Sequence, residues 1–253
     1  MNKNRIAASL IALMSMYAQA DTLMGLYLGG QVWANTTSGS FGNTSSADNQ
    51  VILDFDNEYQ GSFNVAFEHP IPLIPNIKIA STTLDTIGST TLSTSFTFEG
   101  ETYNNSAYLA TTVNASYLDY TLYYELFDND LLTLDFGITA RDFDAYVKIV
   151  ESSNNKESDL AVSGYIPMLY LSTIVGLPFT GYNIFAEGNI MSLDSQTIYD
   201  VQAGVSYELI DNLLVDVDIT LGYRSVKIAL NDLDNLSSDL SFSGAFTGVI
   251  VHF

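Results

Sequence analysis

The segment Gly244-Ala-Phe-Thr-Gly-Val-Ile-Val-His-Phe253 decides the fold. Counting back from Phe253, alternate positions carry Val251, Val249, Thr247 and Ala245. The positions between them carry His252, Ile250, Gly248, Phe246 and Gly244. Successive side chains of a β-strand point to opposite faces, so this pattern predicts a two-faced strand that runs to Phe253.

Residues 1–20 have the pattern of a cleaved secretory signal peptide. Lys3 and Arg5 supply the positive start, residues 6–16 are apolar, and Ala18-Gln19-Ala20 is a small-residue cleavage site. An apolar helix of this length is too short to cross about 30 Å of hydrocarbon, which argues against a membrane anchor. We therefore expect an exported chain whose single domain is residues 21–253.

The composition favours an ordered and acidic domain. The chain has no cysteine, which excludes a disulfide-stapled scaffold. Hydrophobic residues make up 47%, with 14 Phe and 16 Tyr, which argues against a disordered acidic tail. The net charge is -21, and removal of the two basic residues of the signal peptide makes it -23. Such a surface repels nucleic acid.

After the signal peptide no apolar run approaches the roughly 20 residues of a membrane-spanning helix. Apolar and polar residues alternate instead, which is the period of a strand with two unlike faces. Ten segments show this pattern: 26–34, 60–68, 77–84, 117–126, 132–139, 167–175, 183–190, 199–209, 215–224 and 244–253.

A soluble β-sandwich also alternates, because one face of each sheet is solvated. Here the apolar faces are nearly free of charge and are rich in Tyr and Phe near strand ends, as a lipid-facing belt requires. Lipid offers no partner to backbone groups, so such a sheet must close on itself. We predict an all-β fold, a closed antiparallel up-and-down transmembrane β-barrel of ten strands. Eight or twelve strands stay open, because residues 91–98 fit a loop hairpin or a strand extension.

The links between the predicted strands alternate in length. The short links are 69–76, 127–131, 177–182 and 210–213. The long links are 35–58, 85–115, 142–166, 191–197 and 225–239. Membrane barrels of bacteria have short periplasmic turns and longer external loops, so an even strand count places both termini in the periplasm.

The chain contains one internal repeat. Residues 124–141 (YELFDNDLLTLDFGITAR) and 207–224 (YELIDNLLVDVDITLGYR) align without gaps and are identical at eight of 18 positions. Each predicts a strand end, a tight Asp-Asn turn and a returning strand, because Asn and Asp tolerate left-handed backbone. Duplication of one hairpin and convergence on the same hairpin explain the likeness equally well.

Charged residues fall on the face opposite the apolar one, which would line the lumen. The predicted polar network of the lumen consists of Asp119, Asp135, Arg141, Asp200, Asp216, Asp218 and Arg224. A buried Arg is costly unless it is paired. We therefore expect Arg224 and Asp200 to lie directly opposite one another near the external rim, and Arg141 to bind Asp119 or Asp142.

The same hairpin register sets Glu208 opposite Asp216 near the periplasmic mouth, a mildly unfavourable pair. Aromatic and apolar side chains share the predicted lumen: Tyr27, Trp33, Tyr117, Tyr123, Met168, Tyr170, Phe185 and Phe246. Side chains of this size can fill a narrow barrel. We therefore expect the lumen to be closed or only slightly open, with a preference for cations if it conducts.

Catalytic chemistry has little support in the sequence. The two histidines, His69 and His252, lie at predicted periplasmic positions without an obvious nucleophile beside them, so we expect no enzyme and no cofactor. Oxygen ligands that suit a divalent cation are present but weakly patterned: Asp54, Asp56, Glu58, Asp232 and Asp234. In a strand the first three would point one way. Repulsion that keeps the loops soluble is the simpler explanation.

Short motifs along the chain resemble small, largely uncharacterised outer-membrane β-barrel proteins of Gram-negative proteobacteria. They are Tyr124-Glu125-Leu126, Pro167-Met168-Leu169-Tyr170, Leu177-Pro178-Phe179-Thr180-Gly181, Tyr207-Glu208 and the terminal strand, together with the signal peptide. The resemblance implies a barrel in the outer membrane, and it carries no catalytic residue. Val249, Val251 and Phe253 would then form the C-terminal signal that barrel-assembly machinery reads.

Two functions are consistent with these features. The first is a non-enzymatic barrel that stabilises the outer membrane or passes a small solute. The alternative is a surface-binding or adhesion module that acts through long acidic and Ser/Thr/Asn-rich loops. The expected partners are outer-membrane lipid, lipopolysaccharide, the assembly machinery and divalent cations at the loops, but not nucleic acid.

Overall fold

The computed structural model describes residues 24–43, 50–129, 131–193, 196–212, 214–233 and 236–253. The predicted signal peptide and cleavage site therefore lie outside the described residues. In the part described, regular structure consists of β-strands, and no helix is long and apolar enough to cross a membrane. The wall strands are β1 (Gly25–Asn43), β4 (Glu58–Glu68), β5 (Asn76–Thr82), β10 (Tyr117–Asn129), β11 (Leu132–Glu151), β12 (Lys156–Leu177), β13 (Tyr182–Leu193), β14 (Gln196–Ile210), β15 (Asp216–Leu233) and β16 (Leu236–His252).

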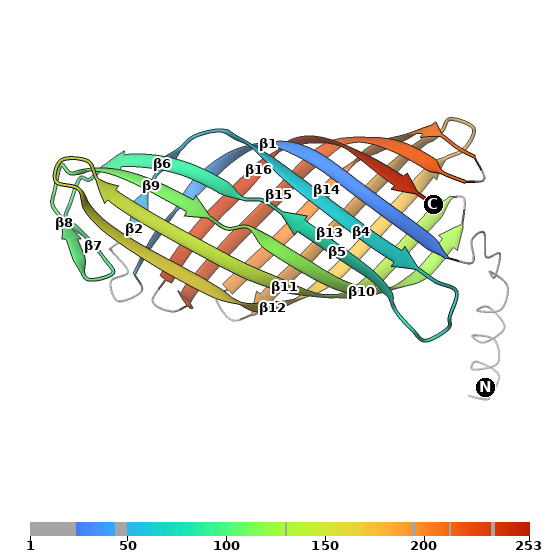
Figure 1. Cartoon of the computed structure of the whole chain (residues 1–253), viewed down its shortest axis with the longest axis horizontal. Coiled ribbons are helices and arrows are strands. Elements are labelled where there is room, and N and C mark those ends of the chain that lie inside the picture. Colours follow the sequence, from blue (N-terminus) through green and yellow to red (C-terminus); the bar gives the residue numbers. More distant parts are fainter. Residues whose placement is uncertain (1–23, 44–49, 130, 194–195, 213, 234–235) are drawn as a thin grey trace, which may run out of the picture.

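These ten strands form a closed antiparallel barrel, as predicted (Figure 1). The order is β10-β5-β4-β1-β16-β15-β14-β13-β12-β11, and β11 pairs with β10 to complete the circle. The seam between β1 and β16 continues to Phe253, whose backbone N–H donates to Leu26 O at 3.0 Å and whose carbonyl accepts from Leu26 N–H at 3.2 Å. The sheet therefore has no free edge around its membrane-spanning part.

The two ends of the barrel differ, and we name them by their connections. The turn end carries the β4–β5, β10–β11, β12–β13 and β14–β15 turns, together with Gly25 and Phe253. The loop end carries the other connections and the remaining strands. These are β2 (Gln50–Ile52), β3 (Asp54–Phe55), β6 (Asp85–Thr91), β7 (Phe96–Phe98), β8 (Glu101–Tyr103) and β9 (Tyr108–Asn114). In Figure 1 the β7–β8 hairpin and Phe253 lie at opposite ends of the molecule.

The predicted strand ends are wrong at the loop end, because strands continue through much of the predicted long links. β1 runs on to Asn43, and only residues 152–155 separate β11 from β12. Within residues 85–115, β6 and β9 pair with each other and β9 pairs with β11, while β7 and β8 form a separate hairpin. The segment 91–98 therefore belongs to a loop hairpin, which leaves the strand count at ten.

The physical reason is that apolar and polar residues go on alternating past the predicted strand ends, but the apolar face there points inward instead of outward. In the turn-end half the exposed face is apolar: Ile138, Leu169, Ile184 and Leu221 all point outward. In the loop-end half the same outward face carries polar residues such as Asp144, Asp159 and Ser241, while apolar side chains turn inward. The inward set includes Phe41, Leu84, Phe96, Phe98, Leu109, Val113, Ile149, Val162, Val226, Ile228, Leu240 and Phe242.

The loop-end half is thus built like a soluble β-structure. On one side lie β12, β11, β9, β6 and β3, and on the other lie β2, β1, β16 and β15. The β13–β14 hairpin stops at Leu193 and Gln196, and the pairing of β12 with β13 starts only at Leu169. Among the described residues, positions 156–168 of β12 therefore pair with β11 alone, and this stretch is an open strand edge.

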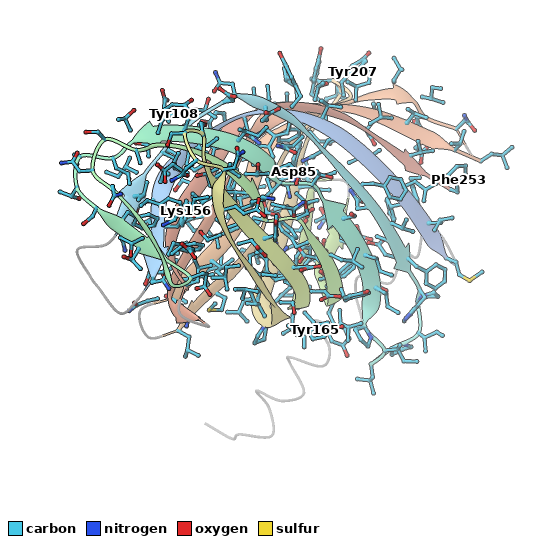
Figure 2. All side chains as sticks on the ribbon, turned by 60° about the vertical axis from the view of Figure 1, so that its left-hand side comes forward. Asp85, Tyr108, Lys156, Tyr165, Tyr207 and Phe253 are labelled. Atoms are coloured by element: carbon cyan, nitrogen blue, oxygen red, sulfur yellow. The ribbon has the colours of Figure 1, made fainter. Side chains whose placement is uncertain are left out.

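Exposed aromatic side chains mark the limits of the apolar belt. Tyr165 (72% exposed) and Tyr207 (41%) point away from the barrel (Figure 2). Further exposed Tyr and Phe side chains on the outer surface are Tyr59, Phe67, Tyr120, Tyr124, Phe127, Phe179, Tyr182, Tyr223 and Phe253. Amphipathic rings suit the interface between hydrocarbon and water, so they define a transmembrane zone in the turn-end half.

Candidate functional site: the interior of the barrel

The interior has three layers, which follow from the reversal of the strand pattern. A polar vestibule opens at the turn end and is lined by side chains from β1, β4, β5, β10, β11, β12 and β13. A buried ionic layer built on Arg141 and Arg224 lies beyond it. The apolar core of the loop-end half closes the far side.

Arg141 and Asp119 lie directly opposite each other on β11 and β10. Arg141 donates from Nε to Asp119 Oδ1 and from one terminal nitrogen to Asp119 Oδ2, both at 2.8 Å, so the pair is bidentate. The guanidinium also lies 3.5 Å from the centroid of the Tyr117 ring. Arg141 is fully buried, and this geometry is what makes a buried guanidinium tolerable.

Arg224 makes a second bidentate pair, with Asp200, at 2.8 and 2.7 Å. Its remaining N–H groups donate to Ser62 Oγ at 2.6 Å and to Thr82 Oγ1 at 3.0 Å. Arg224 therefore joins β14 and β15 to β4 and β5 through the middle of the barrel.

Asp200 connects the two arginine clusters. Besides Arg224 it accepts a hydrogen bond from the Tyr117 hydroxyl at 2.5 Å and lies 3.4 Å from a terminal nitrogen of Arg141. Asn189 completes the cluster by donating to Asp119 at 3.5 Å and accepting from Thr139 at 2.6 Å. The network ties opposite walls of the barrel together, so it braces the wall across the middle of the lumen.

The expected Arg224–Asp200 pair is present, but two details of the prediction are wrong. Asp200 lies opposite Val226, and Arg224 lies opposite Gln202, so the ion pair is diagonal. The register differs because β14 ends at Ile210 and β15 begins only at Asp216, which leaves a longer connection than a tight hairpin needs. The pair is also not at a rim, since Arg224 is the ninth of the 18 residues of β15. Of the two partners predicted for Arg141, Asp119 forms the ion pair, while Asp142 faces outward.

The internal repeat forms two hairpins with the same framework. Each has a register shift at the equivalent place, between Glu125 and Phe127 and between Glu208 and Ile210. In the first turn Asn129 Oδ1 accepts from the N–H groups of Leu131 and Leu132 at 3.0 and 3.2 Å. In the second turn Asn212 Oδ1 does the same for Leu214 and Val215 at 3.1 and 3.3 Å.

Near the turn end, a row of acidic and other polar side chains crosses neighbouring strands. Glu125 lies directly opposite Asp135, and the next inward positions in register are Ser172, Glu187 and Gln202. In the second hairpin Glu208 lies opposite Asp218, not opposite Asp216 as predicted. The bulge and the longer turn shift this pair as well.

The vestibule contains a cavity of about 320 Å³ and an adjoining one of about 190 Å³. Five carboxylates line the larger cavity: Glu68, Glu125, Asp128, Asp135 and Glu187. Lys78 reaches into it from β5 and is held by both oxygens of Glu187 at 2.6 and 2.7 Å. Three tyrosines, Tyr27, Tyr123 and Tyr170, also line this cavity.

The two histidines lie at the turn end. His252 stacks on Tyr27 with ring centroids 4.1 Å apart, and its Nδ1 lies 3.4 Å from Asp216. His69 Nδ1 accepts from the backbone N–H of Ile71 at 3.3 Å. Asp218 lines the smaller cavity. All seven members of the predicted network thus lie on the inner side. Six of them belong to the two arginine clusters or line the vestibule, and Asp216 lies against His252.

The structure fully describes three of the five weakly patterned acidic residues, and these three do not lie on one strand. Asp54 is in β3 and Glu58 is in β4, with Asp56 between the two strands, so the three do not share one strand face as expected. The side chain of Asp232 and the whole of Asp234 lie outside the described residues. The described part of the chain contains no group of three His, Cys, Asp or Glu side chains placed to hold a metal. Val249 and Phe253 are exposed on the outer face of the terminal strand segment, with Val251 partly exposed between them.

Aromatic residues close the loop end. Phe41 lies edge-on to Phe98, with ring centroids 5.5 Å apart, and Phe96 stacks on Tyr103 at 6.3 Å. The Tyr103 hydroxyl lies 2.7 Å from Ser158 Oγ on β12, so the β7–β8 hairpin is fastened to the wall. Burial raises the pKa of Tyr103, which keeps this hydroxyl neutral.

Sequence reasoning missed several interior residues. Lys78, Glu68 and Glu187 form much of the vestibule, and Asn189 and Thr82 belong to the ionic layer. Alternation on β5 and β13 assigns these positions to the inner face. Their partners come from distant strands, and no spacing in the sequence reports a contact across a barrel.

Comparison with solved structures agrees with the fold. The chain is similar to the outer-membrane protease OmpT from Escherichia coli, with a TM-score of 0.50 and 11% identity over 90% of this chain and 96% of that one. Weaker likenesses are to the monoaromatic hydrocarbon channel CymD (TM-score 0.34, 10% identity, 90% and 87% covered) and to Neisserial surface protein A (0.30, 10%, 90% and 97%).

No protein-family model matches the chain, and no curated protein matches it. At these identities the likeness shows the fold alone, a β-barrel of the Gram-negative outer-membrane type.

Proposed function

We propose that this protein is a non-enzymatic outer-membrane barrel that does not conduct solutes and acts at the cell surface through its loop-end half. One observation carries the proposal. The interior of the loop-end half holds an apolar core, while its outer face carries many polar residues beside a few exposed apolar ones such as Ile52 and Ile87. A pore needs a wet path through the barrel, and we infer that this core together with the ionic layer blocks such a path.

The first test is conductance in planar lipid bilayers. The refolded barrel should give no discrete channel steps, whereas a general porin inserted under the same conditions gives them. Steady cation-selective steps from the barrel would contradict the proposal and favour the narrow-pore alternative.

The second test concerns which end faces outward. The chain has no cysteine, so a single introduced thiol is a unique label. Asp159→Cys places it on the exposed face of β12 at the loop end, and Asn212→Cys places it in a turn at the other end. A membrane-impermeant maleimide should label the first variant on intact cells and the second only after permeabilisation. The reverse pattern would contradict a surface role.

The open edge of β12 supports an interaction role. Residues 156–168 pair with β11 only, and unpaired backbone groups on a strand edge can accept a further strand. A surface module that acts through a folded loop end fits these features better than one that acts through extended acidic loops. The expected partners remain lipid and lipopolysaccharide around the belt, divalent cations at exposed acids such as Asp54, and assembly machinery at Val249, Val251 and Phe253.

The likeness to a protease does not extend to chemistry. OmpT is a protease, but an identity of 11% carries no residue across to this chain. Here both histidines lie at the turn end, where His252 contacts Tyr27 and Asp216 and His69 contacts the backbone of its own turn. The refolded barrel should therefore leave peptide substrates intact, and a cleavage that is lost in His252→Ala would overturn this part of the proposal.

A further inference from the structure

We propose that the turn-end vestibule is a binding site for a linear polyamine. The site is the pair of adjoining cavities that share Lys78, Glu187, Tyr27 and Asn64 in their walls. The ligand class follows from the charge, the unsatisfied groups and the shape of this space.

The charge of the vestibule is strongly unbalanced. Lys78 is the one Lys or Arg in the described lining of the larger cavity, and its charge is paired with that of Glu187. Glu68, Glu125, Asp128 and Asp135 then face the same space. Glu68 accepts from the Tyr123 hydroxyl at 2.7 Å and Glu125 from Asn76 at 3.2 Å, but these neutral donors leave the carboxylate charge in place. Asp135 is buried and Glu68 is half-buried, while Glu125 and Asp128 are exposed. Carboxylates of like sign around one space attract a cation, most strongly where burial limits screening by water.

Asp135 interacts with Ser172, which lies directly opposite it on β12, but one of its carboxylate oxygens is left without a donor. It is 7% exposed, it lines the larger cavity, and its Oδ1 has no hydrogen-bond partner among the described residues. It also lies directly opposite Glu125, and like charges opposite each other on neighbouring strands are destabilising. A buried carboxylate oxygen without a donor, next to a second carboxylate, is the arrangement that an ammonium group would complete.

The arrangement suits an organic cation better than a metal ion. Within the described residues no three acidic side chains converge closely enough to hold a metal, so the carboxylates are spread along the cavity. The larger cavity of about 320 Å³ has room for a chain of roughly ten heavy atoms, since one water occupies about 30 Å³ of liquid.

The tyrosines suit the rest of such a ligand. The rings of Tyr123 and Tyr170 lie 5.7 Å apart, and the Lys78 ammonium already lies 5.5 Å from the Tyr170 centroid. Aromatic faces attract ammonium groups and also pack against methylenes. Amines separated by short methylene segments would therefore place charge at the carboxylates and carbon at the rings.

The test is calorimetric titration of the refolded barrel with spermidine in a zwitterionic detergent at low salt. We expect saturable binding near one to one. Asp135→Asn should weaken it at least tenfold, and Glu125→Gln should weaken it similarly. Asp159→Asn removes an exposed carboxylate at the loop end and should leave the affinity unchanged.

Three results would overturn the proposal. The first is the absence of saturable heat up to millimolar spermidine. The second is equal affinity in wild type and both vestibule variants. The third is displacement of spermidine by Mg²⁺ or Na⁺ at matched ionic strength as effectively as by spermine, which would show a diffuse ion atmosphere. If one variant does not refold, the other still decides the outcome.

Discussion

The two hairpins of the internal repeat share a framework but use their inner faces differently. Both the β10–β11 and the β14–β15 hairpins have a Glu–Asp pair beside the turn, a bulge at the same place and an arginine six residues beyond the aspartate. In the first hairpin the arginine faces its carboxylate, Asp119, directly. In the second it faces Gln202 and reaches diagonally to Asp200. The conformation at the turn end of each hairpin thus depends on residues within that hairpin. The contacts of its inward-facing side chains depend on residues of the opposite wall.

Asp200 is where the two hairpins meet, and its removal should have the largest effect. Asp200→Asn removes a single buried carboxylate that binds Arg224 and also lies near Arg141, which keeps Asp119. Breaking a buried pair from one side costs about 3–5 kcal/mol, because it leaves a charge without compensation. We expect the free energy of unfolding in urea, measured on barrels folded in lipid vesicles, to fall by about this amount.

The matched change in the first hairpin is Asp119→Asn. Arg141 would keep Asp200 at 3.4 Å and the Tyr117 ring at 3.5 Å. The loss should therefore be smaller than that of Asp200→Asn. An equal or larger loss would show that the two arginine clusters are independent rather than joined at Asp200.

Each hairpin has a glycine in its returning strand, at a position that differs between the two hairpins. The second prediction concerns substitution of these glycines. Gly137 faces Tyr123, and a Cβ there would lie 2.7 Å from the Tyr123 Cβ and 2.2 Å from the Leu122 carbonyl oxygen. Gly222 faces Phe246, whose ring would lie 2.7 Å from an added Cβ. Gly137→Ala and Gly222→Ala should each destabilise the barrel by about 1–3 kcal/mol in the same assay, through overpacking.

Gly30 and Gly61 are the controls for these substitutions. Both are exposed, and an added Cβ would meet nothing within 4 Å. Gly30→Ala and Gly61→Ala should be neutral or stabilising by a few tenths of a kcal/mol, since they lower the entropy of the unfolded chain. A loss at these positions as large as at Gly137 would point to general sensitivity of strands to substitution rather than to contact with the aromatic rings.

The turns test how alike the two frameworks are. Asn129 and Asn212 each accept from two backbone N–H groups in equivalent positions. Asn129→Ala and Asn212→Ala should each lower the free energy of unfolding by about 1 kcal/mol, the usual effect of losing a side-chain cap. The two losses should agree to within a few tenths of a kcal/mol. A clear difference would mean that the turns resemble each other only in sequence.

The sequence predicted what depends on local pattern. Alternation identified all ten wall strands and the inner faces of the strongly alternating ones, because lipid on one side and a polar lumen on the other impose the same period on each strand. It failed at the loop end, where the inward set around Phe41 and Ile149 is apolar and the strands run on beyond the belt. Apolar and polar residues still alternate there, but the apolar ones face inward and the polar ones outward. A prediction that looks for an apolar outer face therefore ends the strands too early.

The site was predictable only where partners are close along the chain. Arg141 and Asp119, and Arg224 and Asp200, are within one hairpin each, and the need to neutralise a buried guanidinium identified them. The contacts of Arg224 with Ser62 and Thr82, and of Lys78 with Glu187, cross the barrel. They depend on how the wall curves, and the spacing of residues in the sequence does not report that curvature.

The smallest expected effect separates the two Glu–Asp pairs. Asp135 is 7% exposed and opposes Glu125 inside the vestibule, whereas Asp218 is only partly buried and opposes Glu208. Repulsion between facing carboxylates is stronger where water screens it less. Asp135→Asn should therefore stabilise the barrel by about 0.5–1 kcal/mol at low salt, and Asp218→Asn should stabilise it less. Urea unfolding at low and high salt checks this, because added salt should shrink the difference. If Asp135→Asn destabilises the barrel in the absence of any polyamine, Asp135 has a structural partner, and the vestibule is not held open for a cation.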